Sequence, residues 1–255
     1  MFPLRDENST ELTPVVTVLI IVANVLVWLF VQGAGAGSAF LESLCAHGAI
    51  PGHITGALGS GEVVPLGPDA TCRIGPPGYG TLLTSMFMHG GWMHLIGNMW
   101  FLWVFGNNVE DSMGHGRFAF FYVLTGLIAA GAHIAAAPGS AVPTVGASGA
   151  ISGIMGAYIV LYPRVRVDTL IILLFYVRVA PLPAWTLLLL WFFLQLLEGA
   201  IAAGGVASGV AVWAHIGGFV AGALLIRLFE RPNLVRAKRE GRVLGRDELG
   251  RFGRW

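Results

Sequence analysis

The sequence predicts an all-α membrane protein built from six transmembrane helices. Of its 255 residues, 55% are hydrophobic and only 11% are charged, and its mean hydropathy is +0.73. Soluble globular domains carry about 25% charged residues. The apolar residues are gathered into long runs, and about 20 consecutive apolar residues suffice for a helix to cross the hydrocarbon core of a bilayer. This composition excludes an ordinary soluble domain.

Five apolar runs are long enough to span a membrane. They are Pro14–Gln32, Met86–Phe105, Phe118–Ala137, Ala184–Ala202 and Val206–Phe229. A sixth run, Ser148–Tyr162, is Gly-rich and would be the fourth span in chain order. At 1.5 Å per residue it would be only about 22 Å long, against a hydrocarbon core of about 30 Å. Residues 1–13 are polar and partly acidic, unlike a cleaved signal peptide, so we expect the first run to be retained as a helix.

Basic residues predict how these helices are oriented. With an inner N-terminus and six spans, the outer segments carry only Arg73. The inner segments carry Arg5, Arg117, Arg164, Arg166, Arg178 and the tail from Arg227 to Arg254. Lys and Arg are retained on the cytoplasmic side. We therefore expect a multi-pass protein of a prokaryotic plasma (inner) membrane with both termini in the cytoplasm. The short apolar run Leu170–Val179 would place the tail outside if it spanned, so we interpret it as interfacial or re-entrant.

Two polar segments accompany the membrane domain of residues 14–229. The outer loop, residues 33–80, is rich in Gly and Pro and contains both Cys45 and Cys72. Because the outer compartment is oxidising in most cells, a disulfide is plausible, but two free thiols remain the alternative. The cytoplasmic tail, residues 230–255, is charged and is either solvated or bound to anionic headgroups. Its interspersed acidic residues favour the solvated state.

Polar side chains inside apolar runs are costly, so each marks a candidate functional position. Ser148 lies in the sequence GASGAISG, between Gly146 and Gly149, and Pro143 ends any earlier helix. Ser148 is thereby placed at or beside a helix N-terminus, where free backbone N–H groups favour negative charge, as an oxyanion requires. The simpler interpretation is an N-cap serine beside small residues that allow close helix packing.

His215 lies in the sequence AVWAHIGGFVAG, where Gly218 and Gly222 let its helix approach another one closely. A lone histidine could simply bond to a neighbouring helix. Depth favours a pairing with Ser148, which would lie roughly 8–10 Å below the outer surface, because His215 would lie about 13 Å below it. We therefore predict that the serine and the histidine meet, and that the loop before Ser148 lines a water-filled cavity.

His94 and Asn98 form a second polar pair inside the membrane. They are four residues apart on the second apolar run, so they share one helix face at a depth similar to that of Ser148. An asparagine amide can donate a hydrogen bond to a developing oxyanion. A polar pair that only joins helices is the alternative, and the shared depth favours membership of the site. His133 is a further histidine inside an apolar run.

Three sequence blocks together resemble the rhomboid family of intramembrane serine proteases. The family pattern His-x4-His-x3-Asn matches His89, His94 and Asn98. Its Gly-x-Ser-Gly matches residues 146–149, and its Ala-His-x2-Gly-x3-Gly matches residues 214–222. The order and spacing of the blocks fit the family, as does FGNNVEDSMG after the second helix, and the resemblance covers nearly the whole chain.

The resemblance implies a rhomboid-like bundle whose short fourth helix carries the nucleophile, Ser148, with His215 as general base. The resemblance also implies which groups surround or support the oxyanion. They are the backbone N–H of Ser148 and the residues His94, Asn98, His89 and Gly146. Two features depart from the family pattern. Many members place an aromatic residue that stacks on the histidine one turn after the nucleophile, where this chain has Ser152. A Trp-Arg pair common in the first outer loop is also missing from residues 33–80.

These residues predict a serine endopeptidase that cleaves transmembrane segments near the outer face with a Ser-His dyad. We expect no cofactor and no metal ion, because the intramembrane histidines lack zinc-site spacing with carboxylates or cysteines. The expected partners are the lipid bilayer and single-span membrane proteins whose helix unwinds near the outer surface, and no nucleic acid.

Two other functions compete with proteolysis. A catalytically silent rhomboid-like scaffold would bind transmembrane helices without cutting them. Such relatives typically lose the serine or the histidine, and this chain has both. A small transporter would predict charged or discontinuous helices near the midplane and two paired halves, which the sequence does not suggest.

Overall fold

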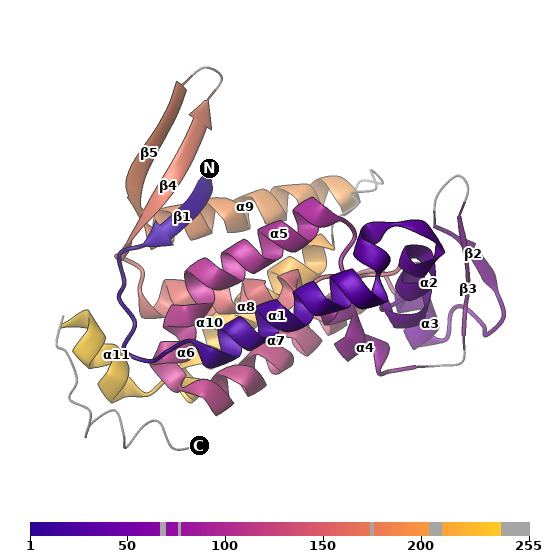
Figure 1. Ribbon diagram of the computed structural model, residues 1–255, viewed down its shortest axis with the longest axis horizontal. Coiled ribbons are helices and arrows are strands. Elements are labelled where there is room, and N and C mark those ends of the chain that lie inside the picture. The colour runs from indigo at the N-terminus through magenta and orange to yellow at the C-terminus, as the bar shows by residue number, and fades with distance from the viewer. Residues whose placement is uncertain (67–69, 76–77, 174–175, 204–210, 241–255) are drawn as a thin grey trace.

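The computed structural model describes residues 1–66, 70–75, 78–173, 176–203 and 211–240. Its main helices run lengthwise, side by side (Figure 1). They are α1 (Val15–Leu26), α5 (Trp92–Phe101), α7 (His115–Ala136), α8 (Ser148–Leu161), α9 (Ala184–Ala203) and α10 (Val212–Phe229). Helix α1 continues as a π-helical turn to Val31, and α5 continues through a π-helical turn, Leu102–Gly106, into α6 (Asn107–Met113).

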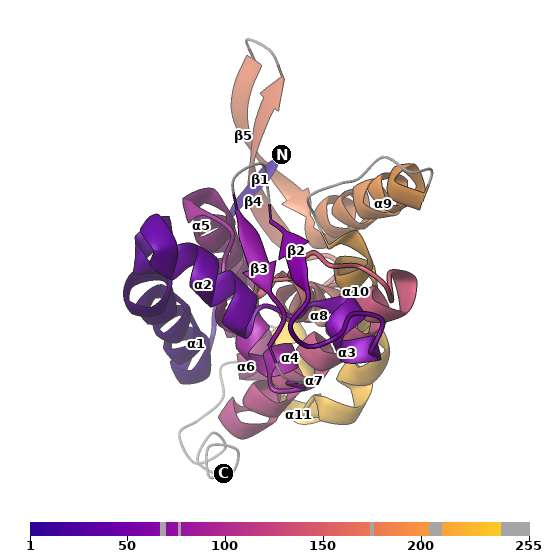
Figure 2. The same ribbon diagram turned by 90° about the vertical axis from the view of Figure 1, so that its right-hand side faces the viewer.

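The lengthwise helices connect two different ends of the molecule (Figures 1 and 2). We call one the hairpin end, which carries β1 (Phe2–Asp6), β4 (Arg166–Leu173), β5 (Tyr176–Pro183) and α11 (Pro232–Arg239). We call the other the disulfide end, which carries α2 (Gly37–His47), α3 (Pro51–Thr55), β2 (Val63–Pro65) and β3 (Thr71–Arg73). A short helix, α4 (Thr81–Thr84), leads from the disulfide end into α5.

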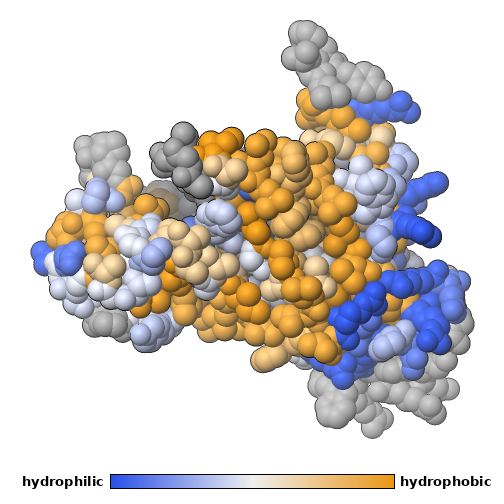
Figure 3. Space-filling view, turned by 180° about the vertical axis from the view of Figure 1, so that it is seen from behind, coloured by the Kyte–Doolittle hydropathy of each residue, from blue (hydrophilic) through white to orange (hydrophobic). Residues whose placement is uncertain are grey.

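Helices α7, α9 and α10 are long and apolar enough to cross a membrane, whereas the apolar helices Val15–Val31 and Ser148–Leu161 are shorter. Large apolar side chains project from the lengthwise helices, such as Phe30 (79% exposed), Leu224 (73%) and Leu228 (76%). Figure 3 shows apolar residues covering the middle of one face, with hydrophilic residues gathered at the hairpin end. An apolar surface of this kind is typical of contact with lipid.

The chain is mostly helical, as predicted, but it also contains two antiparallel sheets that the all-α prediction left out. Strands β1, β4 and β5 pair in the order β1-β4-β5, and β2 pairs with β3. The run Leu170–Val179, expected to be interfacial or re-entrant, contributes residues 170–173 to β4 and residues 176–179 to β5, which project away from the helices (Figure 1). Its β-branched residues favour extended backbone, and pairing satisfies the backbone N–H and C=O groups.

The beginning of the tail packs against the bundle. The ammonium group of Lys238 on α11 donates to Asn108 Oδ1 (2.6 Å) and to Asp111 Oδ2 (2.7 Å). Burial lowers the pKa of Lys238, and the Asp111 carboxylate opposes that shift. Leu234 and Val235 of the same helix are buried. The solvated interpretation was therefore wrong for this part of the tail, and the tail beyond residue 240 lies outside the described residues.

The segment FGNNVEDSMG provides a hydrogen-bond acceptor for the N-terminus of α1. Glu110, which is fully buried, accepts hydrogen bonds from Val16 N (2.9 Å), Thr17 N (2.8 Å) and Thr17 Oγ1 (2.7 Å). The residue before α1 is Pro14, which makes no side-chain cap. Glu110 therefore satisfies the free N–H groups of the first turn from another helix, and its negative charge suits the positive end of the helix dipole.

The two cysteines are joined. Cys45 on α2 and Cys72 on β3 form a disulfide with a Cα–Cα distance of 5.5 Å. We expect alkylation of the unreduced, denatured protein to find no free thiol by mass spectrometry, and two alkylated cysteines only after reduction. Two alkylated cysteines before reduction would contradict the bridge.

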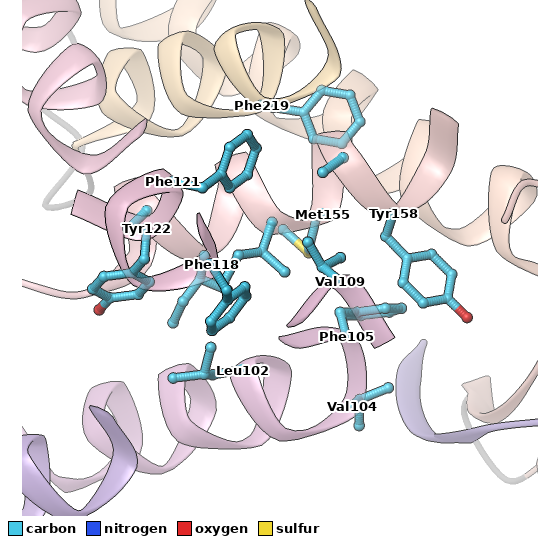
Figure 4. Packing of buried hydrophobic residues seen from close by; sticks show 14 of the residues in the cluster. Leu102, Val104, Phe105, Val109, Phe118, Phe121, Tyr122, Met155, Tyr158 and Phe219 are labelled. Atoms are coloured by element: carbon cyan, nitrogen blue, oxygen red, sulfur yellow. The ribbon is translucent and has the colours of Figure 1, made fainter. Parts of the chain in front are cut away.

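A cluster of buried aromatic and aliphatic side chains holds the lengthwise helices together. Figure 4 shows Phe105, Phe118, Phe121, Tyr158 and Phe219 converging between them. Phe105 and Tyr158 meet edge to face with ring centroids 5.0 Å apart. Burial of large side chains from several helices fixes how α8 lies between α7 and α10.

Helices α8 and α10 pack closely through glycines. A Cβ added to Gly218 would collide with the carbonyl oxygen of Gly149, and one added to Gly222 with that of Gly153. This confirms that the small residues beside Ser148 and those beside His215 allow close helix packing. Because no side chains separate the two backbones, the positions of the first residues of α8 and α10 are coupled.

Candidate active site

Ser148 and His215 lie within hydrogen-bonding distance at the disulfide end of the bundle. Ser148 is the first residue of α8 and His215 lies in the first turn of α10. The distance from Ser148 Oγ to His215 Nε2 is 2.8 Å. The free N–H groups of the first turn of α8 lie beside the hydroxyl. The predicted meeting of serine and histidine is present in this geometry.

Helix α10 begins at Val212, six residues after the start of the apolar run Val206–Phe229. Residues 206–210 of that run lie outside the described residues. His215 therefore lies near the end of its helix, as Ser148 does, and both side chains belong to first turns at the same end of the bundle.

His94 lies against the loop that precedes Ser148. Its Nδ1 accepts a hydrogen bond from the backbone N–H of Gly90 (3.2 Å), so the ring proton belongs on Nε2. A Cβ added to Gly146 would lie 2.8 Å from that Nε2, and Gly146 has a φ of +128°, which favours glycine. The absence of a side chain at Gly146 thus lets a ring N–H reach the backbone beside Ser148.

Asn98 and His89 accompany His94. Asn98 lies one turn further along α5, is 8% exposed, and its Nδ2 has no hydrogen-bond partner among the described residues. The fully buried ring of His89 meets that of His94 edge to face, with centroids 5.1 Å apart. Gln32 holds the backbone of His89 through two hydrogen bonds of 2.8 Å, one to its carbonyl and one from its N–H. His89 therefore contacts His94, and its ring nitrogens make no hydrogen bond to another described residue.

Helix α9 brings two residues to His215 that sequence reasoning missed. Gln195 Oε1 lies 2.6 Å from His215 Nδ1. The ring of Trp191 lies 5.8 Å from the imidazole, centroid to centroid, at an angle of 39°. The two residues are four apart and so share a helix face. Gln195 is itself a polar side chain within an apolar run, and this signal in the sequence could have identified it.

Ser152 does not support the histidine. Its side chain is buried at 1% exposure and its hydroxyl donates to the carbonyl of Ser148, one turn earlier on α8, at 2.7 Å. The position where many rhomboids carry an aromatic residue is thus occupied by a hydroxyl bonded within its own helix. Trp191 provides the aromatic contact from a different helix.

A pocket opens beside Ser148. The pocket is open to the outside, and its empty space is about 480 Å³ with open solvent included. Small residues of α7 and α8 form much of its wall, including Ala129, Ala130 and Gly149. His133 also lines it, and its Nδ1 is buried without a hydrogen-bond partner in the described part of the chain. The pocket has room for water next to the serine hydroxyl.

Comparisons with known proteins identify the family of the chain. The chain is 32% identical to the rhomboid protease GluP of Bacillus subtilis (strain 168) over 144 residues, which are 56% of this chain and 24% of GluP. It is 37% identical over 78 residues to Rhomboid-like protein 11, chloroplastic, of Arabidopsis thaliana, covering 31% of this chain and 28% of that protein. The matched part is thus about a quarter of the length of each relative. The Rhomboid domain matches residues 77–232, which is more than half of the chain, and the chain therefore belongs to the rhomboid family.

Proposed function

We propose that this chain is an intramembrane serine endopeptidase in which Ser148 is the nucleophile and His215 the general base. The observation that carries the proposal is the 2.8 Å contact between Ser148 Oγ and His215 Nε2 at the first residue of α8. A serine hydroxyl becomes an effective nucleophile when an adjacent base takes its proton. The helix N-terminus favours the negative charge that then develops on the substrate.

The reaction is an acyl transfer in two stages. Ser148 Oγ bonds to the carbonyl carbon of the scissile peptide as its proton passes to His215 Nε2, and the carbonyl π electrons move to the oxygen. His215 then gives the proton to the leaving nitrogen, and the C–N bond breaks. A water molecule repeats the sequence on the acyl-enzyme with His215 again as base. The pocket beside Ser148 offers space from which that water can approach.

Three groups of the chain are proposed to hold the oxyanion: the backbone N–H of Ser148, the Nε2–H of His94 and the side-chain amide of Asn98. The hydrogen bond from Gly90 supports the His94 tautomer that can donate. The unpartnered Nδ2 of Asn98 supports a donor kept available for a substrate. Gly146 and His89 are assigned supporting roles, because one leaves room for the His94 ring and the other packs against it.

We further propose that α1, α5, α7, α8, α9 and α10 are six spans of a membrane domain, residues 14–229, with the hairpin end in the cytoplasm of a prokaryotic cell. Several basic residues support this orientation, since Arg5, Arg166 and Arg239 all belong to elements of the hairpin end. The disulfide at the other end suits an oxidising outer compartment. The site then lies near the outer face, where a single-span substrate helix can unwind.

A serine-directed probe tests the catalytic proposal against the silent scaffold. We expect a fluorophosphonate to label the folded protein covalently at Ser148, because only a hydroxyl beside a base attacks such a phosphorus centre readily. The Ser148→Ala variant and heat-denatured protein serve as controls and should remain unlabelled. Labelling absent from the folded protein would favour the scaffold, and equal labelling of Ser148→Ala would refute the assignment of the nucleophile.

A further inference from the structure

We propose that α9 supplies two positioning residues, Gln195 and Trp191, which hold His215 in the tautomer and orientation that direct its Nε2 at Ser148. The inference rests on the proposed function and extends the dyad to a Ser148–His215–Gln195 relay. Both residues are half-buried on one face of α9, and both face the imidazole.

The tautomer follows from the hydrogen-bond chemistry of the relay. A neutral imidazole carries one N–H, and the Gln195 carbonyl oxygen, 2.6 Å from His215 Nδ1, can only accept. The proton therefore belongs on Nδ1, which leaves the lone pair of Nε2 directed at the Ser148 hydroxyl, 2.8 Å away. With the opposite tautomer, Nε2 would donate to Ser148 Oγ and could not remove its proton.

Gln195 also assists after the proton has moved. Once Ser148 gives its proton to Nε2, His215 becomes an imidazolium that donates from both ring nitrogens. The carbonyl dipole of Gln195 then accepts a charge-assisted hydrogen bond, which is stronger than the bond to the neutral ring. Gln195 is thus expected to stabilise the transition state more than the resting enzyme, and its loss should lower kcat more than it raises KM.

Trp191 restricts the ring from one side. Its ring lies 5.8 Å from the imidazole at 39°, and it also packs on Phe219 of α10, with centroids 6.0 Å apart. Phe219 in turn stacks on Phe192 of α9 at 4.6 Å. This packing fixes α9 against α10, so that Gln195 and Trp191 meet His215 in a defined register. The arrangement compensates for Ser152, whose hydroxyl is bonded within α8.

Gln195 is the group that accepts the hydrogen bond from Nδ1–H of His215. Among the described residues, Nδ1 of His215 pairs with Gln195 and Nε2 pairs with Ser148. Helices α5 and α7 contribute His94 and His133 to the electrostatic surroundings of the ring, and neither is a carboxylate. The third position of the relay is therefore a neutral amide, where the Ser-His-Asp arrangement has a charged group.

Variants that differ only in the acceptor test this role. In purified protein reconstituted into liposomes with a transmembrane substrate, Gln195→Met preserves the side-chain length and removes the acceptor. We expect its kcat to fall about 10- to 100-fold with KM changed less than about threefold. Gln195→Glu keeps an oxygen acceptor in the same place and should restore kcat to within about fivefold of wild type. Leu194→Ala, at a side chain that is 50% exposed on the same helix, should leave both constants unchanged.

The ¹⁵N chemical shifts of His215, assigned by comparison with His215→Ala, give a readout that a purely structural role would not move. We expect the Nδ1–H tautomer in wild type and in Gln195→Glu, and a mixture of tautomers in Gln195→Met. A kcat of Gln195→Met within twofold of wild type, an effect confined to KM, or an unchanged tautomer would each overturn the inference. The proposed function would then still stand on fluorophosphonate labelling at Ser148, so the two failures are distinguishable.

Discussion

Replacing Ser148 or His215 with alanine is expected to lower cleavage of a transmembrane substrate by at least about 1,000-fold. Ser148→Ala removes the atom that bonds to the substrate, and His215→Ala removes the base 2.8 Å from it. The two losses should not add in the double variant, because each residue is ineffective without the other. Single-turnover cleavage of a fluorescent single-span substrate in liposomes measures the rate constants directly.

Ser152→Ala is the matched control for this experiment. It removes a hydroxyl from the same helix, one turn after Ser148, but that hydroxyl donates its proton to the Ser148 carbonyl and not to His215. We expect it to keep much of the wild-type activity. Cleavage by Ser148→Ala at a rate near that of Ser152→Ala would contradict the proposed mechanism.

Gly222→Leu is expected to prevent the normal packing of α10 on α8, and Gly222→Ala to weaken it. A Cβ at this position would overlap the carbonyl oxygen of Gly153, a backbone atom that cannot rotate away. Overpacking of this kind costs about 1–3 kcal/mol for a small side chain. Separation of the two helices would also lengthen the distance between Ser148 and His215. We therefore expect Gly222→Leu to have a lower midpoint of thermal unfolding in detergent and to lose labelling of Ser148 by the fluorophosphonate.

Gly131→Ala on α7 is the control for this prediction. A Cβ at Gly131 meets no atom within 4 Å, so the substitution adds a methyl group without a collision. A glycine within a helix is less favourable than alanine by about 0.5–1 kcal/mol, so this variant should be as stable as wild type or slightly more so. Equal unfolding midpoints for Gly222→Leu and Gly131→Ala would contradict close backbone packing as the force that aligns the site.

The sequence predicted much of the site because its chemistry is local. Ser148 between two glycines after Pro143 indicates a helix N-terminus, and α8 does begin there. The four-residue spacing of His94 and Asn98 places both on α5. The glycines near His215 predicted a close approach to another helix, and the packing of Gly218 and Gly222 against α8 confirms it.

Several features depended on partners that are distant in sequence. The run Leu170–Val179 is apolar enough to suggest a membrane segment, yet its residues 170–173 pair with its residues 176–179, and Leu170 also pairs with Phe2 of the N-terminal strand. Lys238 lies in a charged tail typical of a solvated peptide, but it finds two acceptors on α6. In both cases the local sequence pattern suggested an environment of lipid or water. The structure instead satisfies the polar groups, the strand backbone and the Lys238 ammonium, with partners distant in sequence.

By itself, the sequence determined the apolar composition, the glycine faces and the three motifs from which a serine, a histidine and their family could be inferred. Only the tertiary structure decided which side chain occupies the far side of the histidine. Gln195 and Trp191 reach His215 because α9 packs against α10, and that packing depends on shape complementarity over many side chains. A periodic pattern reports which residues share a helix face, but the face that another helix presents is set when the bundle assembles.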